Sequence, residues 1–307
     1  MKNLPFPSPS LVRLSLLLVL AACGGKAPAK STTPEPAPQA AKAPPPVDGA
    51  DEELELAERQ RAQKDLQGAL ASARKAVAIR PSFAAAHFLV GSILRQQDQL
   101  DEALGEFRKA RELQPSLQNA WAMEGALLVR MEKYNEAIFP LRQAIQLDAK
   151  DASSYANLGA ALRRLEQYAQ AEEVLRAGLR LRPDHPEMLN NIAVVLLRRG
   201  RQAQGIELFR EALRRRPNNA QFRLNLAIAL RSQGNFEEAK KHYEGVLQAQ
   251  PTNTDALFDV AVCYTQLGQR ARAIESYEKY IALEKDREPA AAERAEQLLR
   301  QLRGRSP

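Results

Sequence analysis

The sequence predicts an all-α array of repeats, and three observations lead to that fold class. Five prolines fall in one register with a period of thirty-four positions, at Pro81, Pro115, Pro183, Pro217 and Pro251. Apolar residues make up 45% of the chain, with Ala and Leu prominent and few β-branched runs, a composition that favours helices over strands. A regular period in a chain of 307 residues indicates one repeat array rather than two ordinary domains.

Seven segments, each one period long, follow one another without insertion or deletion from residue 50 to residue 287. The eighth residue of each is small: Ala57, Gly91, Gly125, Gly159, Ala193, Ala227 and Ala261. The twentieth is small as well: Ala69, Ala103, Ala137, Ala171, Gly205, Ala239 and Ala273. Small side chains at two fixed positions let the two helices of a unit pack closely, while larger side chains fill the remaining space. Each unit is therefore expected to be a pair of helices that ends near its proline, which lacks the amide hydrogen of a continuing helix.

These residues resemble the tetratricopeptide repeat (TPR), whose pattern combines small residues at positions eight and twenty with proline at position thirty-two. The resemblance implies an all-α, right-handed superhelix (α-solenoid) of seven repeats over 50–287, in which the first helices line a concave groove. Ala149 and Lys285 replace the proline in two repeats. Residues 288–307 predict a capping helix and tail, because a proline in the first turn precedes Ala295, Leu298, Leu299 and Leu302 on one helical face.

Residues 1–22 predict a lipoprotein signal peptide, because an apolar run from Leu11 to Ala22 follows Lys2 and is too short to span a bilayer. The tetrad ending at Cys23 resembles the lipobox of bacterial lipoproteins, which implies acylation of Cys23 and a lipid anchor in a membrane. Gly24 follows the cysteine instead of Asp, which in lipoproteins of the enteric type indicates the outer membrane, facing the periplasm. An ordinary secretory signal with an incidental cysteine is the alternative.

Residues 23–49 predict a disordered tether, because the stretch from residue 24 to residue 50 contains seven prolines and no aromatic residue. The formal net charge of the whole chain is +7, and removal of Lys2 and Arg13 with the signal peptide leaves +5. A basic balance suits an anionic partner, and an exported location argues against nucleic acid. The two cysteines, Cys23 and Cys263, give no intramolecular disulfide if Cys23 carries lipid, and Cys263 is expected to be buried.

The sequence contains none of the residue patterns that catalysis or metal binding requires. It has no Gly-rich phosphate loop, no HExxH and no CxxC, and its three histidines stand far from other His or Cys residues. His87 is expected in the core, His185 in a turn between repeats and His242 on an exposed helix face. We therefore predict a protein that is not an enzyme, with no catalytic residue, no cofactor, no metal and no small-molecule substrate.

The TPR resemblance points the sixth position of each first helix into the groove, and four successive repeats carry Asn157, Asn191, Asn225 and Asp259 there. A row of side-chain amides offers donors and acceptors to the backbone of an extended peptide. The alternative is that these side chains bond to neighbouring helices and are structural.

Arginines recur at the twelfth and thirteenth positions, which also face the groove: Arg95, Arg130, Arg163, Arg164, Arg198 and Arg231. Arginine pairs with carboxylates in a fixed fork, so an acidic segment or a C-terminal carboxylate is the expected ligand. Solvated charges at exposed helix ends are the alternative.

These features together predict a membrane-anchored scaffold that captures an extended or acidic segment of a protein partner and supports assembly of an envelope machine. The combination resembles type IV pilus pilotins, which help secretins multimerise, and the TPR lipoproteins of gliding motility. The alternative is an adaptor that docks peptidoglycan hydrolases or synthases. The identity of the partner separates these two hypotheses.

Overall fold

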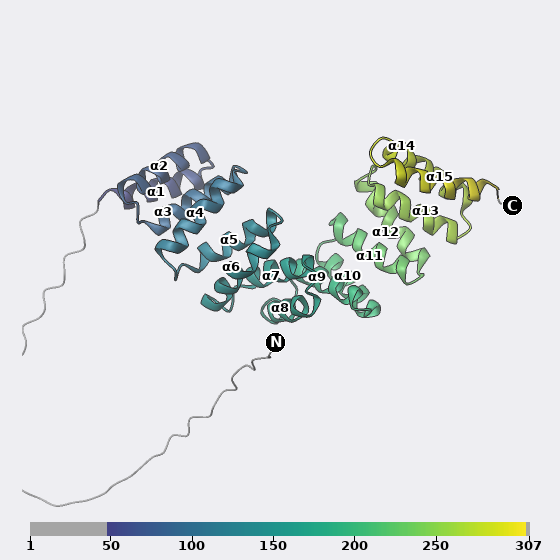
Figure 1. Cartoon of the computed structure of the whole chain (residues 1–307), viewed down its shortest axis with the longest axis horizontal. Coiled ribbons are helices and arrows are strands. Elements are labelled where there is room, and N and C mark those ends of the chain that lie inside the picture. Colours follow the sequence, from purple (N-terminus) through teal and green to yellow (C-terminus); the bar gives the residue numbers. More distant parts are fainter. Residues whose placement is uncertain (1–47, 305–307) are drawn as a thin grey trace, which may run out of the picture. The chain divides into compact units, whose positions relative to one another are not determined.

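The computed structural model describes residues 48–304, which form fifteen α-helices and no strand (Figure 1). The predicted signal peptide, Cys23 and nearly all of the predicted tether lie outside the described residues. The first helices of the repeats are α1 (Ala50–Ala62), α3 (Ala84–Gln96), α5 (Gln118–Arg130), α7 (Ala152–Arg164), α9 (Pro186–Arg198), α11 (Ala220–Ser232) and α13 (Thr254–Gln266). The second helices are α2 (Leu66–Ile79), α4 (Leu100–Leu113), α6 (Tyr134–Leu147), α8 (Tyr168–Leu181), α10 (Gln202–Arg215), α12 (Phe236–Ala249) and α14 (Arg270–Glu284). The last helix is α15 (Pro289–Gly304).

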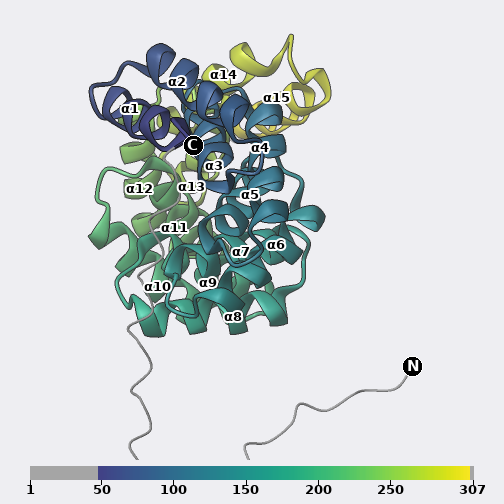
Figure 2. The ribbon, with the colours of Figure 1, turned by 90° about the vertical axis from the view of Figure 1, so that its left-hand side faces the viewer.

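The helices follow the period of the sequence, because each first helix begins one full period after the previous one. The two helices of a repeat pack on each other, and each second helix packs on the first helix of the next repeat (Figures 1 and 2). Several first helices also contact the first helix of the next repeat, among them α5 with α7 and α7 with α9. The prediction of an α-solenoid superhelix of seven repeats is confirmed. Among residues 48–304 no helix combines the length and apolarity needed to cross a membrane.

A tight turn of fixed conformation joins the two helices of every repeat. The fifteenth residue has a positive φ in all seven: Lys64, Asp98, Glu132, Glu166, Gly200, Gly234 and Gly268. The left-handed conformation reverses the chain within a few residues, and glycine adopts it without steric cost. The first four repeats carry a side chain at this position, so the turn is more strained there.

The core of each repeat combines a small residue on the first helix with a large residue on the second. In the fourth repeat Gly159 on α7 faces Leu175 on α8, and in the third Gly125 on α5 faces Leu141 on α6. Both leucines are fully buried, at 0% exposure. The predicted reason for small residues at position eight, close approach of the two helices, therefore holds at these pairs.

The C-terminal helix α15 covers the last repeat, but its apolar face differs from the predicted one. Ala295, Leu299 and Leu302 are buried against the core, whereas Leu298 is 39% exposed. Arg303 holds the end of the helix through an ion pair with Glu278. Leu298 therefore lies at the edge of the buried face, where it lines a hollow described below.

Candidate functional site

The four predicted ladder residues lie at one register of consecutive first helices. Asn157 is on α7, Asn191 on α9, Asn225 on α11 and Asp259 on α13, and all four are partly buried. The repeat geometry thus places them along the surface that the first helices share, but the residues differ in what they contact.

Asn225 is bonded within the protein. Its Nδ2 donates a hydrogen bond to Oδ1 of Asn190 at 2.9 Å, and its Oδ1 accepts one from Nε2 of Gln221 at 3.0 Å. Asn190 is itself only 8% exposed, so the hydrogen bond joins α11 to α9 at a site that is largely buried from solvent. The structural alternative therefore describes Asn225. Asn157 and Asn191 form no side-chain hydrogen bond with other residues of the 48–304 part, which leaves their amides available.

Asp259 belongs to a buried polar cluster between the sixth and seventh repeats. It accepts a hydrogen bond from the Tyr243 hydroxyl at 2.7 Å and forms an ion pair with Nε of Arg231 at 3.3 Å. Burial raises the pKa of Asp259, against the opposing effects of Tyr243 and Arg231. Cys263 lies in the same region, fully buried as predicted, and burial raises the pKa of its thiol to about 11. Asp259 is therefore held by partners within the chain.

The six predicted arginines divide into two groups. Arg130 pairs with Asp98 at 2.6 Å and Arg231 pairs with Asp259, so these two are neutralised within the chain. Arg95, Arg163, Arg164 and Arg198 form no ion pair with any carboxylate of residues 48–304. Glu132 and Glu166 occupy the register of Asp98 in the next two repeats, yet neither pairs with Arg164 or Arg198.

Arg163 is the centre of a small cationic cluster. Its Nε is buried without a hydrogen-bond partner, as are the Nε atoms of Arg95 and Arg231 at the same position of other repeats. Burial lowers the pKa of Arg163, and the positive charges of Arg164 and Arg198 lower it further. The guanidinium of Arg164 lies 5.7 Å from the centre of the Tyr134 ring, an additional cation–π contact. An anionic ligand would relieve the repulsion among these three arginines and supply the missing acceptor.

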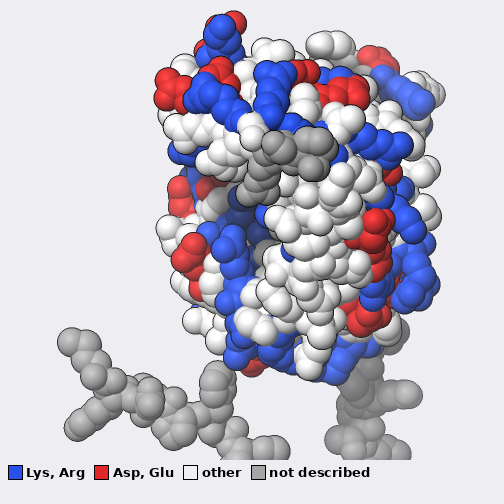
Figure 3. Space-filling view, turned by 90° about the vertical axis from the view of Figure 1, so that its right-hand side faces the viewer, with Lys and Arg blue, Asp and Glu red and all other residues white. Residues whose placement is uncertain are grey.

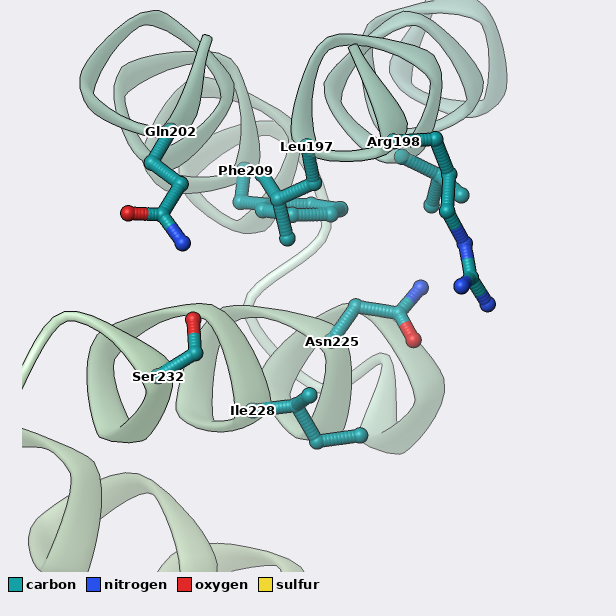
Figure 4. Close-up of a pocket in the computed structure, with 8 residues that line it drawn as sticks. Leu197, Arg198, Gln202, Phe209, Asn225, Ile228 and Ser232 are labelled. Atoms are coloured by element: carbon teal, nitrogen blue, oxygen red, sulfur yellow. The ribbon is translucent and has the colours of Figure 1, made fainter. Parts of the chain in front are cut away.

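A hollow beside Arg198 separates α9 and α10 from α11 (Figure 4). Its volume is about 390 Å³, and its apolar lining comes from Val194, Leu197, Phe209 and Ile228. Arg198, Gln202, Asn225 and Ser232 supply polar groups at its edges. Gln202 and Phe209 lie on α10, a second helix. The sequence-based prediction assigns the groove to first helices alone and does not include these two residues.

Positive charge is concentrated in the middle of the array. The fourth and fifth repeats, residues 152–219, contain twelve arginines, no lysine and seven Asp or Glu residues, a net charge of +5. Figure 3 shows Lys and Arg side chains inside a hollow on one face and along the lower edge, the side on which α8–α10 lie in Figure 1. The net charge of the other described residues is slightly negative. An acidic ligand is therefore attracted most strongly to α7–α10.

The histidines lie in separate places. His87 is buried and its Nδ1 lies 2.6 Å from a carboxylate oxygen of Glu106, and His185 lies in a turn as predicted. His242 is less exposed than predicted, because its side chain is only 21% exposed beside Glu238. Across residues 48–304 no group of three or more His, Cys, Asp or Glu side chains is arranged to hold a metal ion.

The repeats and the groove define a tetratricopeptide protein, and comparison with known proteins agrees. The family profile "Cilia and flagella-associated protein 70 C-terminal domain" matches residues 18–256, and a tetratricopeptide repeat profile matches residues 230–299. The chain belongs to the family of that C-terminal domain. No curated protein matches the chain significantly.

Solved structures share the fold at low sequence identity. A tetratricopeptide repeat protein from Parabacteroides merdae has a TM-score of 0.60 at 16% identity, covering 83% of this chain and 99% of that one. PilF of Pseudomonas aeruginosa has a TM-score of 0.58 at 23% identity, covering 67% and 92% of the two chains. YrrB, described as a TPR protein with an unusual peptide-binding site, has a TM-score of 0.52 at 21% identity, covering 62% and 97%. These likenesses concern the fold alone.

Proposed function

We propose that this protein is a non-catalytic scaffold, anchored to the outer membrane through lipid on Cys23, that binds an extended acidic segment of a partner protein in its groove. The scaffold then supports assembly of an envelope machine of the type IV pilus, secretin or gliding-motility kind. The fold supports protein binding in general, and the acidic segment, the anchor and the machine are the proposed part.

The observation that carries the proposal is the cluster of Arg163, Arg164 and Arg198 on α7 and α9. These arginines form no ion pair with any carboxylate of the described part of the chain, although Glu residues stand at the register where Asp98 pairs with Arg130. Three cations that lie close together without a counter-charge strengthen the binding of a ligand that carries carboxylates. Asn157 and Asn191 lie on the same two helices and can bond the ligand backbone.

Photo-crosslinking in intact cells tests the groove. A photoreactive residue at position 198 should form an adduct with a component of a pilus, secretin or motility complex, identified by mass spectrometry. The matched control replaces Arg180, an exposed arginine of α8 outside the hollows described here. Adducts with a cell-wall hydrolase or synthase would support the adaptor alternative, and adducts from position 180 but not from position 198 would contradict the groove.

Cell fractionation tests the anchor. Cys23→Ser should release the protein from membranes into soluble fractions, because the acyl chains on Cys23 are the proposed anchor. Persistent membrane association of the variant would contradict the lipid anchor, and separation of inner and outer membranes tests the location.

A further inference from the structure

A second hollow lies at the C-terminal end of the array, where α15 meets α13 and α14. Its volume is about 490 Å³. Phe258, Tyr280 and Leu298 give it an apolar lining, and Arg294, Gln297 and Gln301 give it a polar edge. The spacing of these four α15 residues places them on one helical face. That face adjoins the buried face that covers the core, because the buried Ala291 also lines the hollow. Helix α15 thus packs on the core with one face and lines the hollow with the next face.

The apolar wall of this hollow is already ordered. The ring of Phe258 lies 5.2 Å from the ring of Tyr280 and 5.7 Å from the ring of Tyr277, which is 3% exposed. Rings held by such contacts need no rearrangement to accept a side chain, so a ligand would lose little binding energy in ordering them. Leu298, at 39% exposure, is the apolar side chain that remains uncovered.

A third hollow, of about 340 Å³, links the C-terminal hollow to the one beside Arg198. It shares Ile228 with the hollow beside Arg198 and Phe258 and Tyr280 with the C-terminal one, and Arg231, Asp255 and Asp259 complete its lining. A row of three neighbouring hollows, here called the trough, therefore runs from α9 past α11 and α13 to α15. Its end at Arg198 is cationic, its middle carries one arginine and two carboxylates, and its end at Leu298 is largely apolar.

We propose that the C-terminal hollow binds a bulky apolar side chain of the same extended acidic segment whose carboxylates contact Arg198. The inference rests on the proposed function and adds a second recognition element to it. Packed helices lie about 10 Å apart, so α9 and α13, which are two repeats apart, are separated by at least about 20 Å. An extended chain spans that distance with about six residues. The ligand is thus an acidic stretch and a bulky apolar residue at least about six positions apart.

Charge argues for a partner segment rather than the protein's own N-terminal region as the occupant. Residues 24–47 contain three lysines, one glutamate and no aromatic residue, so they lack both features that the trough complements. Arg294 forms no ion pair with a carboxylate within residues 48–304, which adds a cation at the apolar end. A second copy of the chain is the remaining occupant, and the experiment below separates it.

Fluorescence anisotropy with labelled peptides tests the inference on the purified protein. The first probe has four glutamates, six Ser or Gly residues and one Phe, made in both chain directions because the trough does not fix the polarity. The second probe replaces Phe with Ala, and the third replaces each glutamate with Ser. The Phe probe should bind about tenfold more tightly than the Ala probe, because a buried aromatic side chain contributes that much.

Leu298→Glu should remove the tenfold advantage of Phe. The charge that it adds repels the acidic Phe and Ala probes alike, so the ratio of their two affinities is the readout. Leu147→Glu is the matched control, because Leu147 is a 43% exposed leucine on α6 outside the trough, and it should change neither affinity. Equal binding of the Phe and Ala probes would overturn the inference and leave the acidic groove standing. A Ser-substituted probe that binds as tightly as the acidic one would instead overturn the proposed function. Concentration-dependent self-association that Leu298→Glu abolishes would assign the hollow to a second copy and overturn the inference.

Discussion

The close packing of Gly159 against Leu175 predicts how the free energy of unfolding changes when a methyl group is added at Gly159. A Cβ added at Gly159 would lie 2.3 Å from both Cγ and Cδ2 of Leu175, far inside van der Waals contact. Leu175 is 0% exposed, so its side chain has no free space into which it can retreat. Gly159→Ala therefore adds only one methyl group, but that group overpacks the core.

The expected magnitude is the difference between two opposing effects. Overpacking of a well-packed core costs about 1–3 kcal/mol. Replacement of glycine by alanine inside a helix returns about 1 kcal/mol, through the higher helix propensity of alanine. Gly159→Ala should therefore lower the free energy of unfolding by up to about 2 kcal/mol.

Gly105 supplies a matched control, because it also lies inside a helix but a Cβ there would meet nothing within 4 Å. Gly105→Ala should raise the free energy of unfolding by about 0.5–1 kcal/mol. Urea unfolding followed by circular dichroism in the far ultraviolet measures both changes, and the two variants should shift the midpoint in opposite directions.

A double-mutant cycle identifies the cause. Leu175→Ala alone should cost about 2–5 kcal/mol, through loss of buried area and a cavity. On that background Gly159→Ala should be neutral or stabilising, because the new methyl group partly fills the cavity. Stabilisation by Gly159→Ala in the native background, or an equal cost with and without Leu175, would refute overpacking as the cause.

Three further changes test separate parts of the structure. Lys64→Gly should raise the free energy of unfolding by about 0.5–1 kcal/mol in urea titrations, because Lys64 has a φ of 66° that glycine adopts freely. Glu172 is 6% exposed and accepts hydrogen bonds from Arg176, Arg199 and Arg201, so Glu172→Gln should cost about 2 kcal/mol at neutral pH. Burial raises the pKa of Glu172, but hydrogen bonds from its arginine partners outweigh burial and lower the pKa below its ordinary value of 4.5. The stabilisation that Glu172 contributes is therefore present above pH 4.5 and is lost at lower pH. Urea midpoints of Glu172→Gln and the unsubstituted protein should therefore converge in acid. Asn225→Ala should lower the thermal midpoint by an amount equivalent to about 1–2 kcal/mol, through its lost bond to a buried neighbour, whereas Asn191→Ala should leave the midpoint unchanged.

The fold could be predicted from the sequence because its determinants recur at a fixed interval. Small residues at positions eight and twenty, and proline at position thirty-two, act through local packing and backbone geometry, which one repeat contains in full. The face of α15 was less predictable. Leu298 and Leu299 are neighbours in sequence and both are leucines, yet only Leu299 is buried in the core. Successive residues of a helix point about 100° apart, and only one of these two directions meets the preceding helices.

The sequence predicts which positions lie in the candidate groove, but it does not predict which arginines there lack an ion pair with a carboxylate of the chain. Arg130, Arg164 and Arg198 share one position of three consecutive repeats, yet only Arg130 is neutralised, by Asp98 of the preceding repeat. The corresponding residues for the other two are glutamates, Glu132 and Glu166, which have nearly the same φ as Asp98 but a side chain longer by one methylene. Pairing across repeats differs between side chains of different length, which the period does not encode.

The division of roles between periodic and variable positions has a consequence for recognition. Packing positions repeat because every interface between neighbouring helices must be stable, and in a solenoid each repeat contacts only its neighbours. Groove positions carry no such constraint, so Arg163 in the fourth repeat and Phe258 in the seventh can present different chemistry on one scaffold. An extended ligand advances about three residues for each repeat, given the spacing of helices and of residues in an extended chain. If the groove binds an extended segment as proposed, each repeat contacts its own short stretch of that segment, and a substitution at one groove position should change recognition of that stretch alone.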